Sequence, residues 1–295
     1  RKPISYRIDA GLLSGAQPIT SNEMGAPISF ARAAHLPLAI HSFASAAKTA
    51  TEFDFEFGAG TSTIVREPFG VIGAIVPWNY PLYMLAEKVA YALAAGNTVI
   101  LKPSEVSPLS TIALCEIVHD LGLPPGVFNV VFGTGPVVGE AIASHRDIGM
   151  VTFTGSTRAG RRVAELAAAS VKRVTLELGG KSPAVLLDDA DFPLAVRTVL
   201  QNAMMNSGQT CSALTRMVVP RAHLGTIESL VKDEIAAYAV GDPTDANTVL
   251  GPLASVAQQK RVLDYIDTGR REGARLITGG GTGRPADDTG AFVEP

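Results

Sequence analysis

Cysteine is scarce in this chain: only two, Cys115 and Cys211, occur in 295 residues. Two cysteines do not form the framework of a disulfide-stabilised secreted protein, so we expect a reducing compartment and a cytoplasmic location. No uninterrupted apolar run approaches the roughly 18 residues of a membrane-spanning helix, which argues against a membrane partner. The five histidines have no metal-ligand spacing such as His-Glu-x-x-His, so we expect no metal.

A large excess of charge is also absent. Lysine and arginine number 25 against 28 aspartate and glutamate, which gives a net charge of −3. Such a balance does not recommend nucleic acid or an anionic membrane as a partner. What the chain does contain is apolar sequence, with 46% hydrophobic and 18% charged residues. This composition is typical of a well-packed protein, and the length suffices for one large or two ordinary domains.

Short β-branched runs alternate with helical patterns between residues 70 and 178. The apolar runs predict strands over 71–76, 98–101, 127–132, 150–153 and 173–178. Helical spacing between them predicts helices over 82–95, 107–121, 137–144 and 157–170, and Gly96 and Gly122 mark the ends of the first two. This order predicts an α/β fold with a Rossmann-like parallel sheet covered on both faces.

A second alternation follows, with a strand over 184–187, a helix over 192–205 and a strand over 217–219. We therefore expect two domains: an N-terminal helical region with a dinucleotide-binding domain over 1–178, and a second α/β domain over 179–295. Apolar spacing over 29–57 predicts one or two surface helices, whereas 1–20 shows no clear period. The glycine-rich run 279–283 precedes no helical pattern and predicts a surface turn rather than a phosphate cradle.

Candidate site residues follow the predicted strands. They occur in 77–79, 102–105, 133–135 and 154–156, and at Glu177. Because ligands bind beyond the carboxyl ends of the strands in such sheets, their shared position indicates a site more strongly than any of them alone.

Cys211 and Glu177 are the residues best suited to covalent chemistry. The cysteine lies among small polar neighbours in the run 206–213, where Gly208 lets a substrate approach the backbone. A thiolate there could attack a carbonyl, and a partly buried Glu177, set in Leu-Glu-Leu-Gly-Gly, could activate water in a later step. An inert thiol and a surface glutamate are equally open interpretations.

Each further candidate also has an ordinary structural interpretation. The run 155–160 opens a helix and could hold a pyrophosphate, or it could be a plain turn. Lys102 and Glu105 could bracket a ribose, with the carboxylate favouring NAD over NADP, or they could be solvated. Asn79 could donate to an oxyanion or form an Asx-turn. Taken alone, Lys88 is a surface lysine, Cys115 is a core residue beside Ile112 and Val118, and the arginines at 158, 161 and 162 form a solvated helix face.

Together these segments, in order from about Glu67 to Pro295, resemble the NAD(P)-dependent aldehyde dehydrogenase superfamily. The most specific matches are Leu-Glu-Leu-Gly-Gly-Lys-Ser-Pro at 176–183 and Gly-Gln-Thr-Cys at 208–211. The resemblance implies that Cys211 is the nucleophile, Asn79 an oxyanion donor, Glu177 the general base and Lys88 part of a proton relay. The cofactor contacts that it implies are Ile75, Trp78, Lys102, Glu105, Gly135, Gly155, Ser156, Gly160 and Leu178. The stretch 206–220 looks most like a bacterial branch acting on aliphatic or ω-oxo aldehydes.

The resemblance also implies what this chain lacks. Members of the superfamily run well over a hundred residues further, so we expect the second domain to be incomplete, without the extended hairpin that joins subunits. The parent protein would be a homo-oligomer, a dimer or a tetramer. The preferred function is NAD-dependent oxidation of an aldehyde to a carboxylic acid. The alternatives are a truncated member that binds a nucleotide or a partner without turnover, and a cysteine hydrolase that uses Cys211 and Glu177 without redox chemistry.

Overall fold

The computed structural model describes residues 16–283 and 290–295, which divide into two compact units. The first unit contains residues 16–19 and 32–178, and the second contains 20–31 with 179–283 and 290–295. Residues 20–31 thus belong to the second unit, although their place in the sequence groups them with the first. Most of the segment for which the sequence gives no pattern lies outside the described residues.

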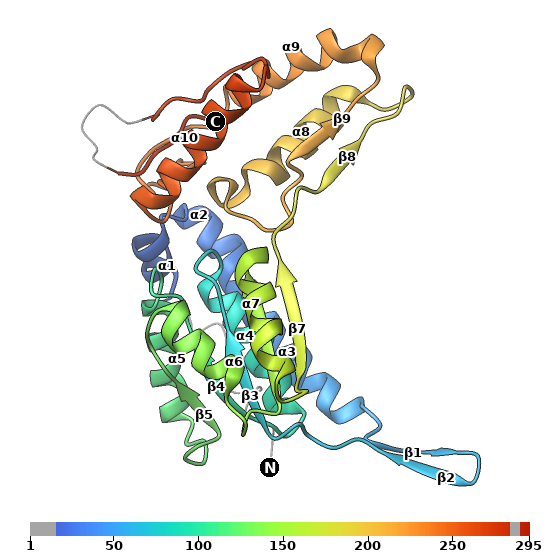
Figure 1. Ribbon diagram of the computed structural model, residues 1–295. Helices are drawn as coiled ribbons and strands as arrows, with labels where there is room; N and C mark the ends of the chain where they lie inside the picture. Colours follow the sequence, from blue (N-terminus) through green and yellow to red (C-terminus); the bar gives the residue numbers. More distant parts are fainter. Residues whose placement is uncertain (1–15, 284–289) are drawn as a thin grey trace. The chain divides into compact units, whose positions relative to one another are not determined.

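A five-stranded parallel sheet forms the centre of the first unit (Figure 1). Its strands are β3 (Val71–Ile75), β4 (Thr98–Lys102), β5 (Phe128–Val130), β6 (Met150–Gly155) and β7 (Arg173–Leu178), in the order β5-β4-β3-β6-β7. All neighbouring pairs are parallel. The predicted α/β class with a parallel sheet is therefore confirmed, and each of the five predicted strands is present.

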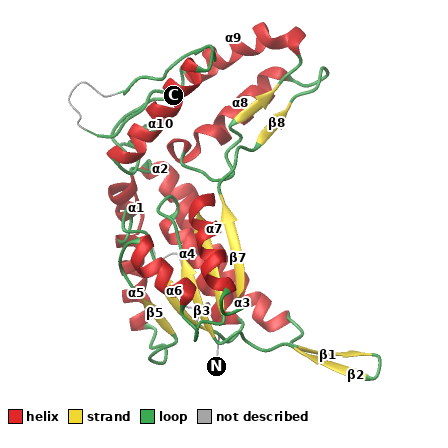
Figure 2. Cartoon of the chain, in the orientation of Figure 1, coloured by secondary structure: helices red, strands yellow, loops and turns green. Residues whose placement is uncertain are grey.

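Helices cover both faces of this sheet (Figure 2). On one face α4 (Pro81–Ala94) contacts β3 and β4 and packs against α3 (Leu36–Glu52) and α5 (Leu109–Asp120). On the other face lie α6 (Glu140–Ser144), preceded by a π-helical turn over Gly135–Gly139, and α7 (Thr157–Ala168). Because successive strand residues point to opposite faces, alternate residues of one strand serve the two layers.

The core between the sheet and α6 and α7 is close-packed at Gly73. Ile75, Val151 and Phe153 pack there with Ile142 and Val163. A Cβ atom on Gly73 would lie 2.4 Å from Cγ2 of Ile142, so the absence of a side chain allows α6 to approach β3.

The structure between residues 29 and 57 differs from the predicted helices; residues 29–31 belong to the second unit and 32–57 to the first. The chain forms α2 (Ile28–Phe30), a π-helical stretch (Ala31–His35) and α3, which ends at Glu52. An exposed antiparallel hairpin follows, made of β1 (Glu56–Ala59) and β2 (Ser62–Val65). Phe53, Phe55 and Phe57 alternate with charged residues, a period-two pattern that favours extended backbone over helix.

The second unit contains a βαβ arrangement. The short strands β8 (Pro183–Val185) and β9 (Arg216–Val218) are parallel, and α8 (Phe192–Met204) connects them. Leu186, Val196 and Leu200 pack with Ile227 and Ile235 of α9 (Leu224–Ile235) to form its core. The side chains of Asp191 and Ser255 cap α8 and α10 (Val256–Arg271), because each accepts a hydrogen bond from the first turn.

Two further segments complete the second unit. In residues 20–31, which include most of α1 (Ala16–Met24), the N–H of Ile28 donates to the carbonyl of Pro243 at 2.7 Å. The glycine-rich run 279–283 forms a loop, as predicted, and the N–H of Gly281 donates to the Glu294 carboxylate at 2.8 Å. Within 16–283 and 290–295, none of the helices has the length and apolar character that crossing a bilayer requires.

Candidate functional site

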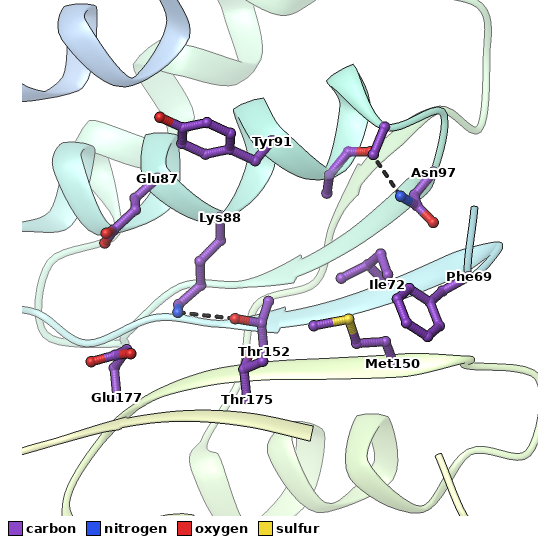
Figure 3. A pocket seen from close by; sticks show the side chains of 12 residues that line it. Phe69, Ile72, Glu87, Lys88, Tyr91, Asn97, Met150, Thr152, Thr175 and Glu177 are labelled. Atoms are coloured by element: carbon purple, nitrogen blue, oxygen red, sulfur yellow. Dashed lines mark hydrogen bonds between the residues drawn. The ribbon is translucent and has the colours of Figure 1, made fainter. Parts of the chain in front are cut away.

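Lys88 and Glu177 line one cavity of about 360 Å³ in the first unit (Figure 3). We call it the lysine cavity. It lies on the α4 side of the sheet, where α4 provides Glu87 and Lys88 and the last turn of that helix is nearby. The strands β6 and β7 each provide every second residue, so the four side chains lie on one face of the sheet: Met150, Thr152, Thr175 and Glu177. The sheet thus brings together two of the candidates that the sequence could only place separately.

Lys88 is buried, with 9% of its surface exposed, so its interpretation as a surface lysine is wrong. Its Nζ donates to the Thr152 hydroxyl at 3.1 Å. Burial lowers the pKa of the ammonium, and the carboxylates of Glu87 and Glu177 offset part of that shift. A lysine with a lowered pKa can exchange a proton at a pH closer to neutrality than an exposed one.

Glu177 lies near the end of β7 and is exposed, which corrects the expectation of a partly buried carboxylate. Its neighbours Leu176 and Leu178 are half-buried and pack toward the α7 core. The apolar residues around Glu177 therefore face the opposite side of the sheet, which is why an apolar sequence does not imply a buried glutamate here.

Lys102 and Glu105 form an ion pair at the carboxyl end of β4. Nζ of Lys102 lies 3.1 Å from Oε2 of Glu105 and donates to the carbonyl of Pro103 at 2.8 Å. The lysine is 2% exposed, whereas Glu105 is exposed. Burial raises the pKa of the Glu105 carboxyl. Hydrogen bonds from its own backbone N–H and from Lys102 lower that pKa by more, so the pKa lies below its ordinary value. A charged carboxylate is thus available at this strand end.

The start of α7 brings together four more candidates. Ser156 caps the helix: its hydroxyl accepts from the N–H of Ala159 at 3.3 Å. A Cβ atom on Gly160 would lie 2.6 Å from Cδ2 of Leu178, and one on Gly155 would lie 2.6 Å from the ring of Phe153. These glycines allow α7 to pack closely against β6 and β7, which is a structural role beside any contact with a cofactor.

Ile75 and Gly135 line a second cavity of about 220 Å³, here called the glycine cavity. It lies on the α7 side of the sheet, opposite to the lysine cavity. Its lining combines apolar residues and a charged rim: Ile75, Gly135, Pro136, Gly139, Phe153, Ala159 and Val163, with Glu140, Arg158 and Arg162. The arginines predicted to form one solvated face are exposed, but two of them border this cavity.

Trp78 and Asn79 are half-buried in the segment that joins β3 to α4. The carbonyl of Trp78 accepts a hydrogen bond from the hydroxyl of Ser107 at 3.1 Å. Ser107 is 1% exposed, so this contact ties the segment to the loop before α5. Asn79 and Trp78 thus lie at the carboxyl end of β3, as their place in the sequence predicts.

Cys211 is exposed in the second unit, where it occupies the first corner of a turn closed by the hydrogen bond from Ala213 N–H to the Thr210 carbonyl. Before it, Asn206, Ser207 and Gly208 adopt positive φ values of 55°, 55° and 75°. Such backbone is unfavourable for residues other than glycine and tends to occur at functional sites.

Hydrogen bonds hold this cysteine turn in place. The Gln209 side chain accepts from the N–H of Ala254 at 3.0 Å and donates to the carbonyl of Asn206 at 3.3 Å. The carboxamide of Asn202 accepts from Leu214 N–H at 2.8 Å. Across the described part of the chain, the N–H of Cys211 forms no hydrogen bond to another backbone group.

Cys115 is half-buried rather than a core residue, and Ile112 on the same stripe is 40% exposed. The buried face of α5 consists of Ser110, Thr111 and Leu114 instead. Two small polar residues occupy this face, so hydrophobicity alone selects the wrong side of the helix. No cluster of three or more potential metal ligands occurs among residues 16–283 and 290–295.

Sequence reasoning assigned no role to Thr152 or Gln209. Thr152 accepts a hydrogen bond from Lys88, and Gln209 stabilises the turn that contains Cys211. Thr152 could have been found from the period of two along 150–154, since that spacing places it on one face with Met150. Gln209 lies in the Gly-Gln-Thr-Cys motif at 208–211, but the local sequence gives no signal for its contact with Ala254, which lies 45 residues away.

A doubly wound parallel sheet with candidate residues at its strand ends is the architecture of a dinucleotide-binding protein. Residues 16–295 match the aldehyde dehydrogenase family, and the chain belongs to it. It is 48% identical over 282 residues to a 3-succinoylsemialdehyde-pyridine dehydrogenase of Pseudomonas, covering 95% of this chain and 59% of that protein. The chain therefore spans about 60% of the length of its relatives.

Solved structures show the same fold. The fold matches that of a cysteine-to-alanine variant of aldehyde dehydrogenase C from Pseudomonas syringae in complex with NAD⁺ and octanal. The TM-score is 0.95 at 48% identity, over 99% of this chain and 61% of the other. An NADP-dependent enzyme of Escherichia coli also matches, with a TM-score of 0.91 at 30% identity, over 99% of this chain and 62% of the other.

Proposed function

We propose that this chain is the greater part of an NAD-dependent aldehyde dehydrogenase that oxidises an aldehyde to a carboxylic acid through a covalent bond to Cys211. The observation that carries the proposal is the exposed thiol at the corner of a turn fixed by hydrogen bonds. Family membership supports aldehyde oxidation in general. The octanal bound to the Pseudomonas syringae enzyme supports an aliphatic aldehyde as the substrate class.

The first half of the reaction forms a thioester on Cys211. The Cys211 thiol loses its proton to solvent, its sulfur attacks the carbonyl carbon to form a C–S bond, and the electron pair of the carbonyl π bond moves to the oxygen as negative charge. The amide of Asn79 and the backbone N–H of Cys211 donate to that oxygen. Nicotinamide, when bound, supplies the acceptor for the hydride that leaves the same carbon. The substrate is then held on the sulfur as a thioester.

The second half releases the acid. Glu177 takes a proton from a water molecule, whose oxygen attacks the thioester carbon while the C–S bond breaks. The carboxylic acid leaves and the thiol is restored. Lys88 exchanges the proton with Glu177, since both line the lysine cavity and burial lowers the pKa of the lysine.

The residues at the strand ends fit a dinucleotide. Lys102 and Glu105 present an ammonium and a carboxylate at the end of β4, suited to the hydroxyl groups of a ribose. The Glu105 carboxylate would repel a 2′-phosphate, which favours NAD over NADP. We assign Gly155, Ser156 and Gly160 to the pyrophosphate side, Gly135 and Leu178 to the same cofactor, and Ile75 and Trp78 to the wall of the nicotinamide channel.

We also infer a homo-oligomer, a dimer or a tetramer, in a reducing compartment such as the cytoplasm. The hairpin of β1 and β2 supports self-association, because all its residues are exposed and open strand edges pair readily. Both cysteines are free thiols, in agreement with a reducing location.

A second candidate function is cofactor binding without turnover. The coverage of about 59% of the Pseudomonas relative supports it, because the rest of that relative is not matched by this chain. Tight NAD binding with no NADH formation from any aldehyde would select this function.

Replacement of Cys211 tests the proposed chemistry. Cys211→Ala should abolish NADH formation from an aliphatic aldehyde, because no sulfur remains to form the thioester. Cys115→Ala is the matched control: this half-buried thiol lies on α5 of the first unit and has no part in the proposed reaction, so the variant should keep full activity. NADH formation that persists in Cys211→Ala would rule the mechanism out.

A further inference from the structure

Lys88 is held by a neutral partner, although two carboxylates line its cavity. Its Nζ donates to the hydroxyl of Thr152 at 3.1 Å, and Figure 3 shows the lysine side chain pointing toward that hydroxyl. Glu87 and Glu177 act on the ammonium through their charge. Neither carboxylate forms an ion pair with Lys88 in the described part of the chain. The hydrogen bond to Thr152 therefore determines where the ammonium lies.

Thr152 offers this ammonium a firmly placed acceptor. It lies in β6, between β3 and β7, where its register partners are Ala74 and Thr175. The branched side chain of a threonine has few rotamers, whereas a lysine side chain is long and flexible and can turn to another acceptor. The position of the ammonium thus depends on Thr152 more than on the lysine itself.

Glu177 is the acceptor that Lys88 would reach if Thr152 did not hold it. Thr152, Thr175 and Glu177 line the cavity from one face of the sheet, opposite to the helix that carries Lys88. Glu87 is adjacent to Lys88 on α4, and adjacent helical residues do not face each other. An ion pair stabilises the charged form of a carboxylate and makes it a weaker base. Pairing with Lys88 would therefore reduce the ability of Glu177 to take a proton from water.

We propose that Thr152 is a positioning residue that keeps the Lys88 ammonium from forming an ion pair with Glu177, so that this carboxylate stays free to activate water. This inference rests on the proposed function. Thr152 acts through Lys88, not on the substrate. Lys88 remains in the same cavity, where it can exchange a proton with Glu177 after hydrolysis.

The titration of Lys88 in the 295-residue chain tests this role without any substrate. With carbon-13-labelled lysine, the Cε signal of Lys88 is assigned by its absence in Lys88→Met, and its shift with pH gives the pKa. Tyr91, another titratable residue of the cavity, donates to Ser45 at 3.0 Å. Thr152→Val removes the hydroxyl and keeps the branched shape. We expect the pKa of Lys88 to rise, because a carboxylate replaces a neutral partner. An unchanged or lower pKa would overturn the positioning role.

Three further variants show whether Glu177 causes the rise. In Thr152→Val combined with Glu177→Gln the rise should disappear, because glutamine carries no charge. Thr175→Val removes the neighbouring hydroxyl of the same cavity and is the matched control, so Lys88 should titrate there as in wild type. Thr152→Ser keeps the hydroxyl and should also titrate as wild type. A rise that persists without the Glu177 carboxylate would assign it to Glu87 and overturn the inference.

The hydrolysis step gives a second readout. Thr152→Val should form the first NADH per Cys211 at the wild-type rate and slow steady turnover about three- to ten-fold, as the loss of one hydrogen bond allows. Thr152→Ser should restore turnover. Equal steady turnover in wild type and Thr152→Val would overturn the positioning role while the proposed function stands. A wild-type chain that forms no NADH from any aldehyde would contradict the proposed function and, with it, this role in hydrolysis.

Discussion

At the scale of single residues, the two carboxylates of the lysine cavity offer a direct comparison. Glu87 and Glu177 line the same cavity, and both offset part of the lowering of the Lys88 pKa by burial. Only Glu177 lies at the end of a strand. If Glu177 activates water, Glu177→Gln should allow the thioester to form and block its hydrolysis. We expect rapid formation of about one NADH per Cys211, followed by little turnover.

Glu87→Gln provides the control for that experiment. It removes one negative charge from the same cavity, so a purely electrostatic effect on Lys88 should appear in both variants. Stopped-flow measurement of NADH absorbance distinguishes them. Steady turnover in Glu177→Gln equal to that in Glu87→Gln would exclude Glu177 as the base.

Burial of Lys88 also makes the stability of the first unit depend on pH. The ordinary pKa is 10.5 and the folded-state pKa is lower, so between these values the unfolded chain holds more protons. The free energy of unfolding should therefore rise with pH through this window. Below the folded-state pKa, Lys88 is charged in the folded protein, and the cost of burying that charge reduces the free energy of unfolding in full.

Comparison with Lys88→Met isolates this contribution. The free energy of unfolding of wild type minus that of the variant should increase between neutral pH and about pH 10.5, measured by urea titration at each pH. Lys48→Met on α3, where the side chain is 72% exposed, should show a nearly constant difference. A difference that falls with rising pH for Lys88→Met would show that burial does not control this lysine.

At the scale of secondary-structure elements, packing at Gly73 limits what β3 can accept. A Cβ atom there would lie 2.4 Å from Ile142 Cγ2 and 3.4 Å from Ile148 Cδ1, so Gly73→Ala must displace α6 or its side chains. We expect a loss of about 1–3 kcal/mol in the free energy of unfolding. Gly58→Ala, also in a strand but with nothing within 4 Å, should cause no loss. Equal stability of the two variants would contradict close packing at β3.

The sequence predicts elements well where a single period dominates. Val71–Ile75 is apolar throughout, as buried parallel strands are. Gly96, which follows α4, correctly predicts where that helix ends. The hairpin after Glu52 was not predicted, because the helical spacing of α3 hides the change to a period of two among Phe53, Phe55 and Phe57. Cys115 was misplaced because its burial depends on tertiary contacts, not on its own helix.

The site residues also divide into those that the local sequence predicts and those that depend on tertiary contacts. The topology of a parallel sheet is sufficient to place Lys102, Gly155 and Glu177 at one edge. The burial of Lys88 depends instead on the strands that α4 packs against. The exposure of Glu177 depends on Leu176 and Leu178, which occupy the α7 side of β7. Neither property has a signal in its local sequence.

At the scale of the whole molecule, the second unit is discontinuous in sequence. Residues 20–31 belong to it, although residues 32–178 of the first unit separate them from Gly179. Closing so large a loop costs entropy, so these contacts should form late in folding. Within the second unit, Gly25 lies against the backbone of Pro252, and Gly251 lies against Gly25.

Gly25→Ala should therefore destabilise the second unit while the first remains intact. Gly25 has a φ of +78°, and a Cβ atom would lie 2.2 Å from the carbonyl oxygen of Pro252, so backbone strain and a clash act together. Gly60→Ala in the hairpin turn has a comparable φ of +63° with nothing within 4 Å, and it measures the strain alone.

Two probes follow the two units separately. Trp78, the single tryptophan, reports on the first unit by fluorescence, and hydrogen–deuterium exchange of α9 and α10 reports on the second. In Gly25→Ala we expect exchange in α9 and α10 to accelerate while the Trp78 unfolding transition is unchanged. Gly60→Ala should leave exchange in these helices at the wild-type rate. If Gly25→Ala instead shifts the Trp78 transition and spares α9 and α10, residues 20–31 stabilise the first unit, and their assignment to the second is wrong.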